Sequence, residues 1–200
     1  MRWVWVVIAL IVSNLATGYF VNKNSIPKID PYRDMNEAMT AMSQSSRYVV
    51  ILGDSVTKRA RWPKQVCGYS LINMGIAGAR ASTFIQYSQE MKLRGLKPSL
   101  TVVALGTNDA LQMKGIDFDS SFELLLRNLH QPLSLVTAFQ PAVAEVNKKI
   151  RTWADREEAL VIETEGLPIP TDDGIHPAKA TFNSWTDVVL AGIRKGLACP

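Results

Sequence analysis

Four short stretches of this sequence contain residue types that could catalyse acyl transfer. Gly53-Asp54-Ser55 places a serine directly after an apolar run, and Asp173 precedes His176 by three residues near the end of the chain. A serine hydroxyl is a weak nucleophile at neutral pH and needs an adjacent base. His176 is the candidate base, and Asp173 could hold its ring in the required tautomer. Two further stretches, Met74–Gly78 and Gly106–Asp109, also follow apolar runs.

Short apolar runs bounded by turn residues predict the buried strands that would position these side chains. The expected strands are Tyr48–Leu52, Tyr69–Asn73, Leu100–Leu105, Leu133–Phe139 and Leu160–Glu163. Apolar residues at helical spacing separate most of them, in Thr83–Leu93, in Phe118–Leu129 and in a segment opened by Pro141. A last helix is expected from Pro177, with Phe182, Trp185, Val189 and Ile193 facing inward.

This alternation predicts an α/β fold with helices on both faces of a parallel sheet. We expect a three-layer α/β/α arrangement with five parallel strands in flavodoxin-like order. Because ligands bind at the carboxyl ends of strands in such sheets, all four polar stretches should lie along one edge.

Several stretches also permit a purely structural interpretation. Asp173 could cap the expected helix near Pro177, Asn108 could be a turn residue, and Gly78 could serve close helix packing. His130 follows a helical apolar run and is expected at a helix end rather than in a site. The sequence contains no phosphate-binding or dinucleotide glycine motif and no Gly-x-Ser-x-Gly elbow, which disfavours the α/β-hydrolase layout.

Taken together, the four stretches resemble the blocks of the SGNH, or GDSL-type, hydrolase family. Gly53-Asp54-Ser55 is similar to the first block, Gly78 to the second, Gly106–Asp109 to the third and Asp173-x-x-His176 to the last. One departure is Val56, where the family commonly has leucine.

The resemblance implies a catalytic triad of Ser55, Asp173 and His176 that uses neither a metal nor a cofactor. It also implies that the oxyanion is bound by the backbone N–H groups of Ser55 and Gly78 and by the side-chain amide of Asn108. The expected activity is hydrolysis of acyl or acetyl oxygen esters, on lipids or cell-surface glycans, through an acyl-enzyme. An O-acyltransferase acting on a cell-envelope glycan is the alternative, and a non-catalytic envelope binding module is a more distant one.

The expected domain organisation has three parts. Residues 1–22 are apolar enough for a membrane anchor or a signal segment, and 23–46 form a linker with a possible short helix beginning at Asp30-Pro31. Within the linker, Tyr32, Met35, Met39 and Met42 recur at helical spacing. Residues 47–200 form the hydrolase domain. We therefore expect a membrane-anchored protein facing the periplasm or exterior, or a secreted one if the first segment is cleaved.

Charge and cysteine content restrict the partners. The net charge of +4 is mild, and the absence of a basic stripe interleaved with aromatics argues against nucleic acid. Lys58, Arg59, Arg61 and Lys64 form one basic cluster, either a solvated face or a substrate mouth that prefers anions. The two cysteines, Cys67 and Cys199, could pair outside the cytoplasm. Oligomeric state and the natural ester stay open.

Overall fold

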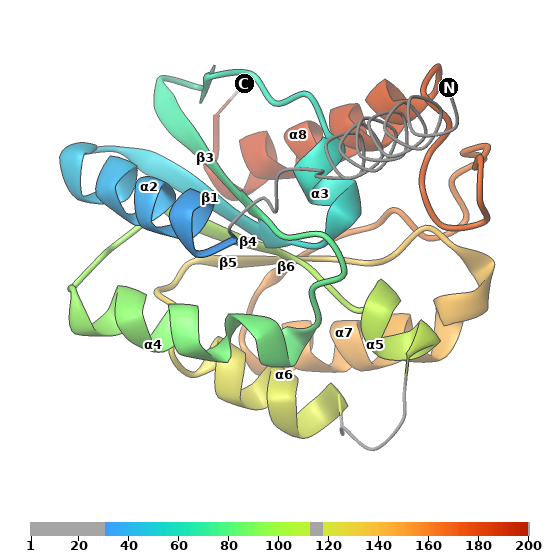
Figure 1. The fold of residues 1–200 in the computed structure, drawn as a ribbon, viewed down its shortest axis with the longest axis horizontal. Helices are drawn as coiled ribbons and strands as arrows, with labels where there is room; N and C mark the ends of the chain where they lie inside the picture. The colour runs from blue at the N-terminus through green and yellow to red at the C-terminus, as the bar shows by residue number, and fades with distance from the viewer. Residues whose placement is uncertain (1–30, 113–117, 200) are drawn as a thin grey trace, which may run out of the picture. The chain divides into compact units, whose positions relative to one another are not determined.

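The computed structural model describes residues 31–112 and 118–199, which form a mixed α/β structure around one six-stranded sheet (Figure 1). The strand order is β2-β3-β1-β4-β5-β6. The strands are β1 (Tyr48–Gly53), β2 (Gln65–Val66), β3 (Tyr69–Gly75), β4 (Leu100–Ala104), β5 (Leu133–Val136) and β6 (Leu160–Ile162). The five longer strands are parallel and follow the flavodoxin-like order predicted from the sequence.

The prediction of a five-stranded, wholly parallel sheet was wrong at one edge. The two-residue strand β2 pairs antiparallel with β3 and forms a sixth strand. Its turn contains Cys67 at φ 52° and Gly68 at φ 76°. Two successive positive φ angles are characteristic of tight hairpin turns. A strand of two residues has no measurable apolar periodicity, so the sequence pattern could not reveal it.

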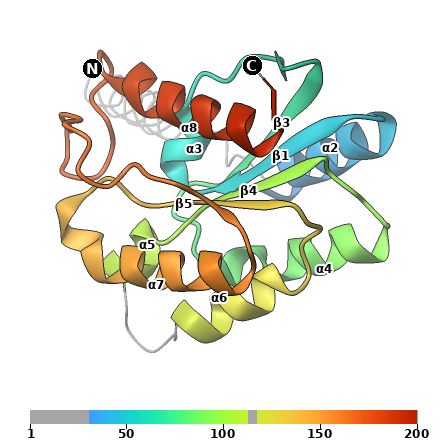
Figure 2. The same cartoon turned by 180° about the vertical axis from the view of Figure 1, so that it is seen from behind.

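Helices cover both faces of the sheet, with α3 and α8 on one side and α4, α5, α6 and α7 on the other (Figures 1 and 2). The α-helices are α2 (Pro31–Gln44), α3 (Ser55–Arg59), α4 (Ile85–Leu93), α5 (Thr107–Leu111), α6 (Phe118–Leu126), α7 (Ala144–Arg156) and α8 (Phe182–Gly196). Short 3₁₀ turns precede two of them, at Ala81–Phe84 before α4 and at Pro141–Val143 before α7.

Strand β1 is buried along its whole length and divides the core into two clusters. Val50 and Leu52 pack with the α4, α6 and α7 side, whereas Val49 and Ile51 pack with the α3 and α8 side. This alternation follows from the two-residue period of a strand. It also explains why the sequence of β1 is continuously apolar rather than alternating.

Helix α2 begins at Pro31, as the Asp30-Pro31 signal predicts. Met35, Met39 and Met42 are almost completely buried and belong to the same cluster as Val50. The methionine stripe is therefore a packing face. The anchor or signal segment expected over residues 1–22 lies outside the described residues, and no helix within 31–112 and 118–199 is long and apolar enough to cross a membrane.

Helix α8 begins at Phe182, not at Pro177 as the sequence suggested. The reason is a closed loop before it, in which Pro177 forms an isolated antiparallel bridge with Thr171. The amide of Ala178 donates to the carbonyl oxygen of Pro170 at 2.8 Å. Because of these contacts, residues 170–178 form a loop rather than the start of a helix. This loop contains Asp173 and His176.

A disulfide joins Cys67 to Cys199, a pairing that the sequence alone leaves open. It connects the β2–β3 turn to the residues that follow α8, with 6.4 Å between the two Cα atoms. The bond therefore ties one edge of the sheet to the last helix.

Candidate active site

Ser55 is the first residue of α3 and lies just beyond the carboxyl end of β1. Asp54 caps this helix, because its Oδ1 accepts a hydrogen bond of 2.8 Å from the amide of Val56. The turn is held closely against β3. A Cβ atom at Gly75 would lie 2.4 Å from the backbone nitrogen of Lys58, so only glycine allows this approach. The strand-to-helix turn thus places the Ser55 hydroxyl at the ligand-binding edge of the sheet.

The structure brings Ser55, His176 and Asp173 into one hydrogen-bonded series. The Oγ atom of Ser55 lies 2.7 Å from Nε2 of His176, and Nδ1 of the same ring lies 2.6 Å from Oδ2 of Asp173. The Asp173 carboxylate accepts a hydrogen bond from Nδ1–H, and this tautomer leaves Nε2 free to accept a hydrogen bond from the serine hydroxyl. This arrangement can draw a proton from Ser55 toward His176.

Asp173 also organises the loop that carries the histidine. Its Oδ1 accepts hydrogen bonds from the amides of His176 at 2.8 Å and Ile175 at 3.0 Å. Those bonds form a local turn, so Asp173 does not cap α8. The amide and ring of His176, together with the Ile175 amide, hold the pKa of the Asp173 carboxyl well below its usual range. Although its side chain is half exposed, Asp173 therefore stays ionised beside the ring.

Asn108 and Gly78 lie just beyond the carboxyl ends of β4 and β3, the two strands that flank β1. Asn108, on α5, donates from Nδ2 to the carbonyl oxygen of Ala79 at 3.0 Å and accepts from Gln112 at 3.2 Å. Each amide nitrogen carries two protons, so one of the Asn108 protons is still available to a ligand. Gly78 adopts φ +74°, and its N–H makes no hydrogen bond within the described part of the chain.

Asp109 connects α5 to the segment that follows Gly78. Both of its carboxylate oxygens lie 3.2 Å from the amide nitrogen of Ala81, and the residue is buried. Burial raises the pKa of the Asp109 carboxyl, whereas the Ala81 amide opposes that rise. Asp109 therefore has a structural role, because it fixes the loop that contains Gly78 relative to α5.

Asp54 is the most deeply buried carboxyl group of the site, at 4% exposure. Burial raises the pKa of Asp54 to about 6, and hydrogen bonds from the Val56 amide and the Thr107 hydroxyl limit the rise. The Thr107 hydroxyl also lies 3.5 Å from Oε1 of Gln140. A buried polar contact therefore links the ends of β1 and β4 to the segment after β5.

Gln140 is a site residue that the sequence analysis missed. Its side chain is 3% exposed, and Nε2 donates a hydrogen bond of 2.6 Å to the carbonyl oxygen of Ile175. A signal was present, because Gln140 lies just after the fourth predicted strand, where a ligand-edge residue would be expected.

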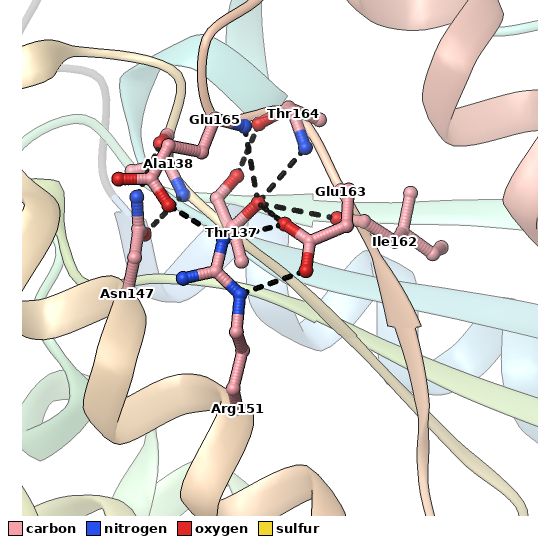
Figure 3. A network of polar contacts seen from close by, with 8 residues as sticks. All are labelled: Thr137, Ala138, Asn147, Arg151, Ile162, Glu163, Thr164 and Glu165. Atoms are coloured by element: carbon pink, nitrogen blue, oxygen red, sulfur yellow. Dashed lines mark hydrogen bonds and ion pairs between the residues drawn. The ribbon is translucent and has the colours of Figure 1, made fainter.

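A second polar network holds the carboxyl end of β6, from which the histidine loop departs (Figure 3). Arg151 of α7 donates to both Glu163 and Glu165, and the hydroxyl of Thr137 accepts from the Thr164 amide at 2.8 Å. The Arg151 guanidinium holds the pKa of the Glu163 carboxyl below its usual range. The network joins the residues that directly follow β5 and β6 to α7.

The remaining histidine lies elsewhere. His130 is exposed, and its carbonyl oxygen accepts from the Thr101 hydroxyl near the amino ends of β4 and β5, opposite the Ser55 edge. Across residues 31–112 and 118–199, no three His, Cys, Asp or Glu side chains are grouped so that they could hold a metal ion.

Comparison with solved structures shows the fold of the GDSL-type lipolytic proteins. A member of the lipolytic G-D-S-L family from Veillonella parvula superposes with a TM-score of 0.57 at 16% identity, covering 73% of this chain and 97% of the other. The psychrotrophic esterase EstA from a Pseudoalteromonas species superposes with a TM-score of 0.62 at 17% identity, covering 76% of this chain and 100% of the other. The resemblance seen in the four sequence blocks is thus confirmed for the fold.

An acyl-transferring protein is among the similar structures. The catalytic domain of the peptidoglycan O-acetyltransferase OatA from Streptococcus pneumoniae has a TM-score of 0.58 and 16% identity, covering 77% of this chain and 94% of that one. No protein-family model and no curated protein sequence matches this chain.

Proposed function

We propose that this chain is a serine ester hydrolase of the SGNH type, acting on acyl or acetyl oxygen esters. The observation that carries the proposal is the hydrogen-bonded series in which Ser55 Oγ lies 2.7 Å from His176 Nε2 and His176 Nδ1 lies 2.6 Å from Asp173 Oδ2. Such a series is the arrangement that a serine needs to become a nucleophile at neutral pH. It lies at the sheet edge where α/β proteins bind ligands.

In the proposed reaction, Ser55 Oγ attacks the ester carbonyl carbon while its proton passes to Nε2 of His176. The ester C–O bond then breaks, and His176 returns the proton to the departing alcohol. A water molecule attacks the resulting acyl-serine, giving one proton to His176, and the acid leaves as Ser55 recovers that proton. Asp173 stays ionised throughout and stabilises the protonated ring.

The tetrahedral oxyanion requires donors near Ser55. As the first residue of α3, Ser55 has an amide N–H with no acceptor inside the helix. We propose that this N–H, the N–H of Gly78 and the free proton of the Asn108 amide bind the oxyanion. One well-placed donor of this kind contributes about 3 kcal/mol to lowering the barrier.

We further propose that the protein acts outside the cytoplasm, with residues 1–22 as an anchor or a cleaved signal. The Cys67–Cys199 disulfide supports it, because such bonds persist mainly in oxidising compartments. The natural substrate would then be an ester on a lipid or a cell-surface glycan.

The direct test uses the full chain with p-nitrophenyl esters of increasing acyl length and a fluorophosphonate probe. We expect hydrolysis of at least the short esters and covalent labelling of Ser55. Ser55→Ala should abolish both signals, whereas Ser43→Ala, at an exposed serine of α2, should leave both unchanged. Hydrolysis that survives in Ser55→Ala would refute the mechanism, and an unlabelled Ser55 would favour a binding module.

Transfer to a glycan is the second candidate, supported by the fold shared with the pneumococcal O-acetyltransferase domain. Both reactions use the same acyl-serine and differ only in the acceptor. Measuring acetyl transfer to added glycan oligomers against release of free acetate distinguishes them. Acetyl groups that appear on the glycan faster than acetate is released would replace the hydrolase proposal.

A further inference from the structure

A basic hollow of about 390 Å³ lies beside the histidine loop. Its lining includes the charged residues Arg59, Arg61, Lys179 and Asp172, with Pro177 and Phe182 as an apolar wall. Three of these side chains are cationic and one is anionic, so the lining has an excess of positive charge.

The hollow is close to the proposed nucleophile and base. Arg59 is four residues after Ser55 in α3, and residues four apart lie on the same helical face, with Cβ atoms about 6 Å apart. Pro177 directly follows His176, and Lys179 lies three residues after it. A ligand in the hollow would therefore lie next to the ester that Ser55 attacks.

The three cations are available to a ligand. Arg59, Arg61 and Lys179 are exposed, and none of them forms an ion pair with another described residue. Their neighbours in the basic cluster differ, because Lys58 lies 3.5 Å from Asp34 and neither Lys58 nor Lys64 lines the hollow. Of the four basic residues in this cluster, Arg59 and Arg61 therefore line the hollow, whereas the two lysines do not.

We propose that this hollow binds an anionic group of the ester substrate, a carboxylate or a phosphate, within about one helical turn of the scissile bond. The inference rests on the proposed esterase function and adds the substrate class. Guanidinium groups bind carboxylates and phosphates through paired, charge-assisted hydrogen bonds. The wall of Pro177 and Phe182 suits the carbon skeleton of a small organic anion, such as an acidic sugar unit.

The test compares three acyl esters on the full chain. These are p-nitrophenyl acetate, which is neutral; mono-p-nitrophenyl succinate, which is anionic on the acyl side; and the acetate ester of p-hydroxybenzoate, which is anionic on the alcohol side. We expect kcat/KM to favour at least one anionic ester over the neutral one. Raising the salt concentration should reduce that preference, because salt screens exposed charges.

The variants are Arg59→Gln with Arg61→Gln, and separately Lys179→Gln. The double variant should lower the anionic-to-neutral ratio of kcat/KM about tenfold, which is roughly the contribution of one hydrogen bond to a charged group. Lys64→Gln is the matched control, since it removes a nearby exposed cation that does not line the hollow. An unchanged ratio in the double variant would overturn the inference.

Two further measurements separate this inference from the esterase proposal. If the wild type cleaves none of the esters, titration with phenyl phosphate, followed through the arginine side-chain N–H signals, still decides the matter. If the wild type binds phenyl phosphate saturably and the double variant does not, the anion site is supported. If the wild type does not bind phenyl phosphate, the inference is overturned. If the double variant weakens binding only to vesicles of anionic phospholipid and leaves the ester ratio unchanged, the basic residues contact a membrane surface and the inference is wrong.

Discussion

The side chain of Gln140 holds the backbone of Ile175, the residue before His176, through a hydrogen bond of 2.6 Å from Nε2 to the carbonyl oxygen. The two residues are 35 positions apart in the chain. Gln140 is itself buried against Thr107, which contacts the cap residue Asp54. The loop that carries the proposed base is thus held by the same buried groups that support the proposed nucleophile.

We predict that Gln140→Met lowers kcat about tenfold with little change in KM. The substitution keeps the length of the side chain but removes one buried hydrogen bond, worth about 1 kcal/mol, and lets the His176 loop shift relative to Ser55. Steady-state kinetics on p-nitrophenyl acetate measure the split between kcat and KM. Gln89→Ala, at an exposed position of α4, serves as the control. A purely structural role would instead lower stability and leave kcat per folded molecule unchanged.

Asp173→Asn should lower kcat by about 10²- to 10⁴-fold while the fold persists. Asparagine can still accept from the amides of Ile175 and His176, so the loop is kept, but the negative charge beside the ring is lost. Stopped assays with excess enzyme are needed to measure so small a rate. Asp155→Asn, at an exposed position of α7, should retain full activity. Near-normal turnover in Asp173→Asn would remove Asp173 from the proposed triad.

Asp54 should make the protein less stable as pH rises from about 4 to about 6. Its folded pKa of about 6 exceeds the ordinary value of 3.8, so the folded state binds the proton more tightly over this range. Stability associated with this proton is present at low pH and is lost as the group ionises. Asp54→Asn can still accept from the Val56 amide, and its free energy of unfolding should gain about 3 kcal/mol relative to wild type across the range.

Urea unfolding at a series of pH values measures this difference. Glu163→Gln is a useful comparison with the opposite sign, because Arg151 lowers the pKa of Glu163. The stability that Glu163 contributes is present above its unfolded pKa and is lost as pH falls. A pH-independent difference between Asp54→Asn and wild type would contradict the burial of an ionisable Asp54.

Removing the Cys67–Cys199 disulfide should lower the free energy of unfolding by about 2–5 kcal/mol. The bond connects residues 132 positions apart, so it restricts the unfolded chain strongly. Denaturant unfolding of the double serine variant, compared with wild type with and without reductant, tests this. Reductant should destabilise the wild type and leave the variant unaffected. Equal stability of oxidised and reduced wild type would contradict the prediction.

Local sequence patterns were sufficient to predict the five parallel strands and the packing face of α2. The continuous apolar run of β1 reports burial on both faces, and the spacing of Met35, Met39 and Met42 reports one buried helical face. The order of strands and helices then restricts the topology, because parallel strands need right-handed crossovers. This is why the flavodoxin-like order was correct and why the four polar blocks converge at one edge.

Other features depend on contacts between residues far apart in the chain. The local spacing of apolar residues does not report such contacts. The start of α8 was predicted five residues too early, because the Thr171–Pro177 bridge holds Pro177 in a loop. The short strand β2 forms only because β3 offers it a free edge.

The amino-acid sequence was enough to predict the candidate site residues Ser55, His176 and Asp173 and the sheet edge on which they lie. These follow from the chemistry of the side chains and from the order of the strands. Three relationships became apparent only in the folded chain: Gln140 supports the His176 loop, Cys67 pairs with Cys199, and Arg59 and Lys179 line one hollow. Each of these relationships joins residues that are far apart in the sequence. Such contacts depend on how the segments between strands and helices pack in the folded chain, and local residue spacing does not report that packing.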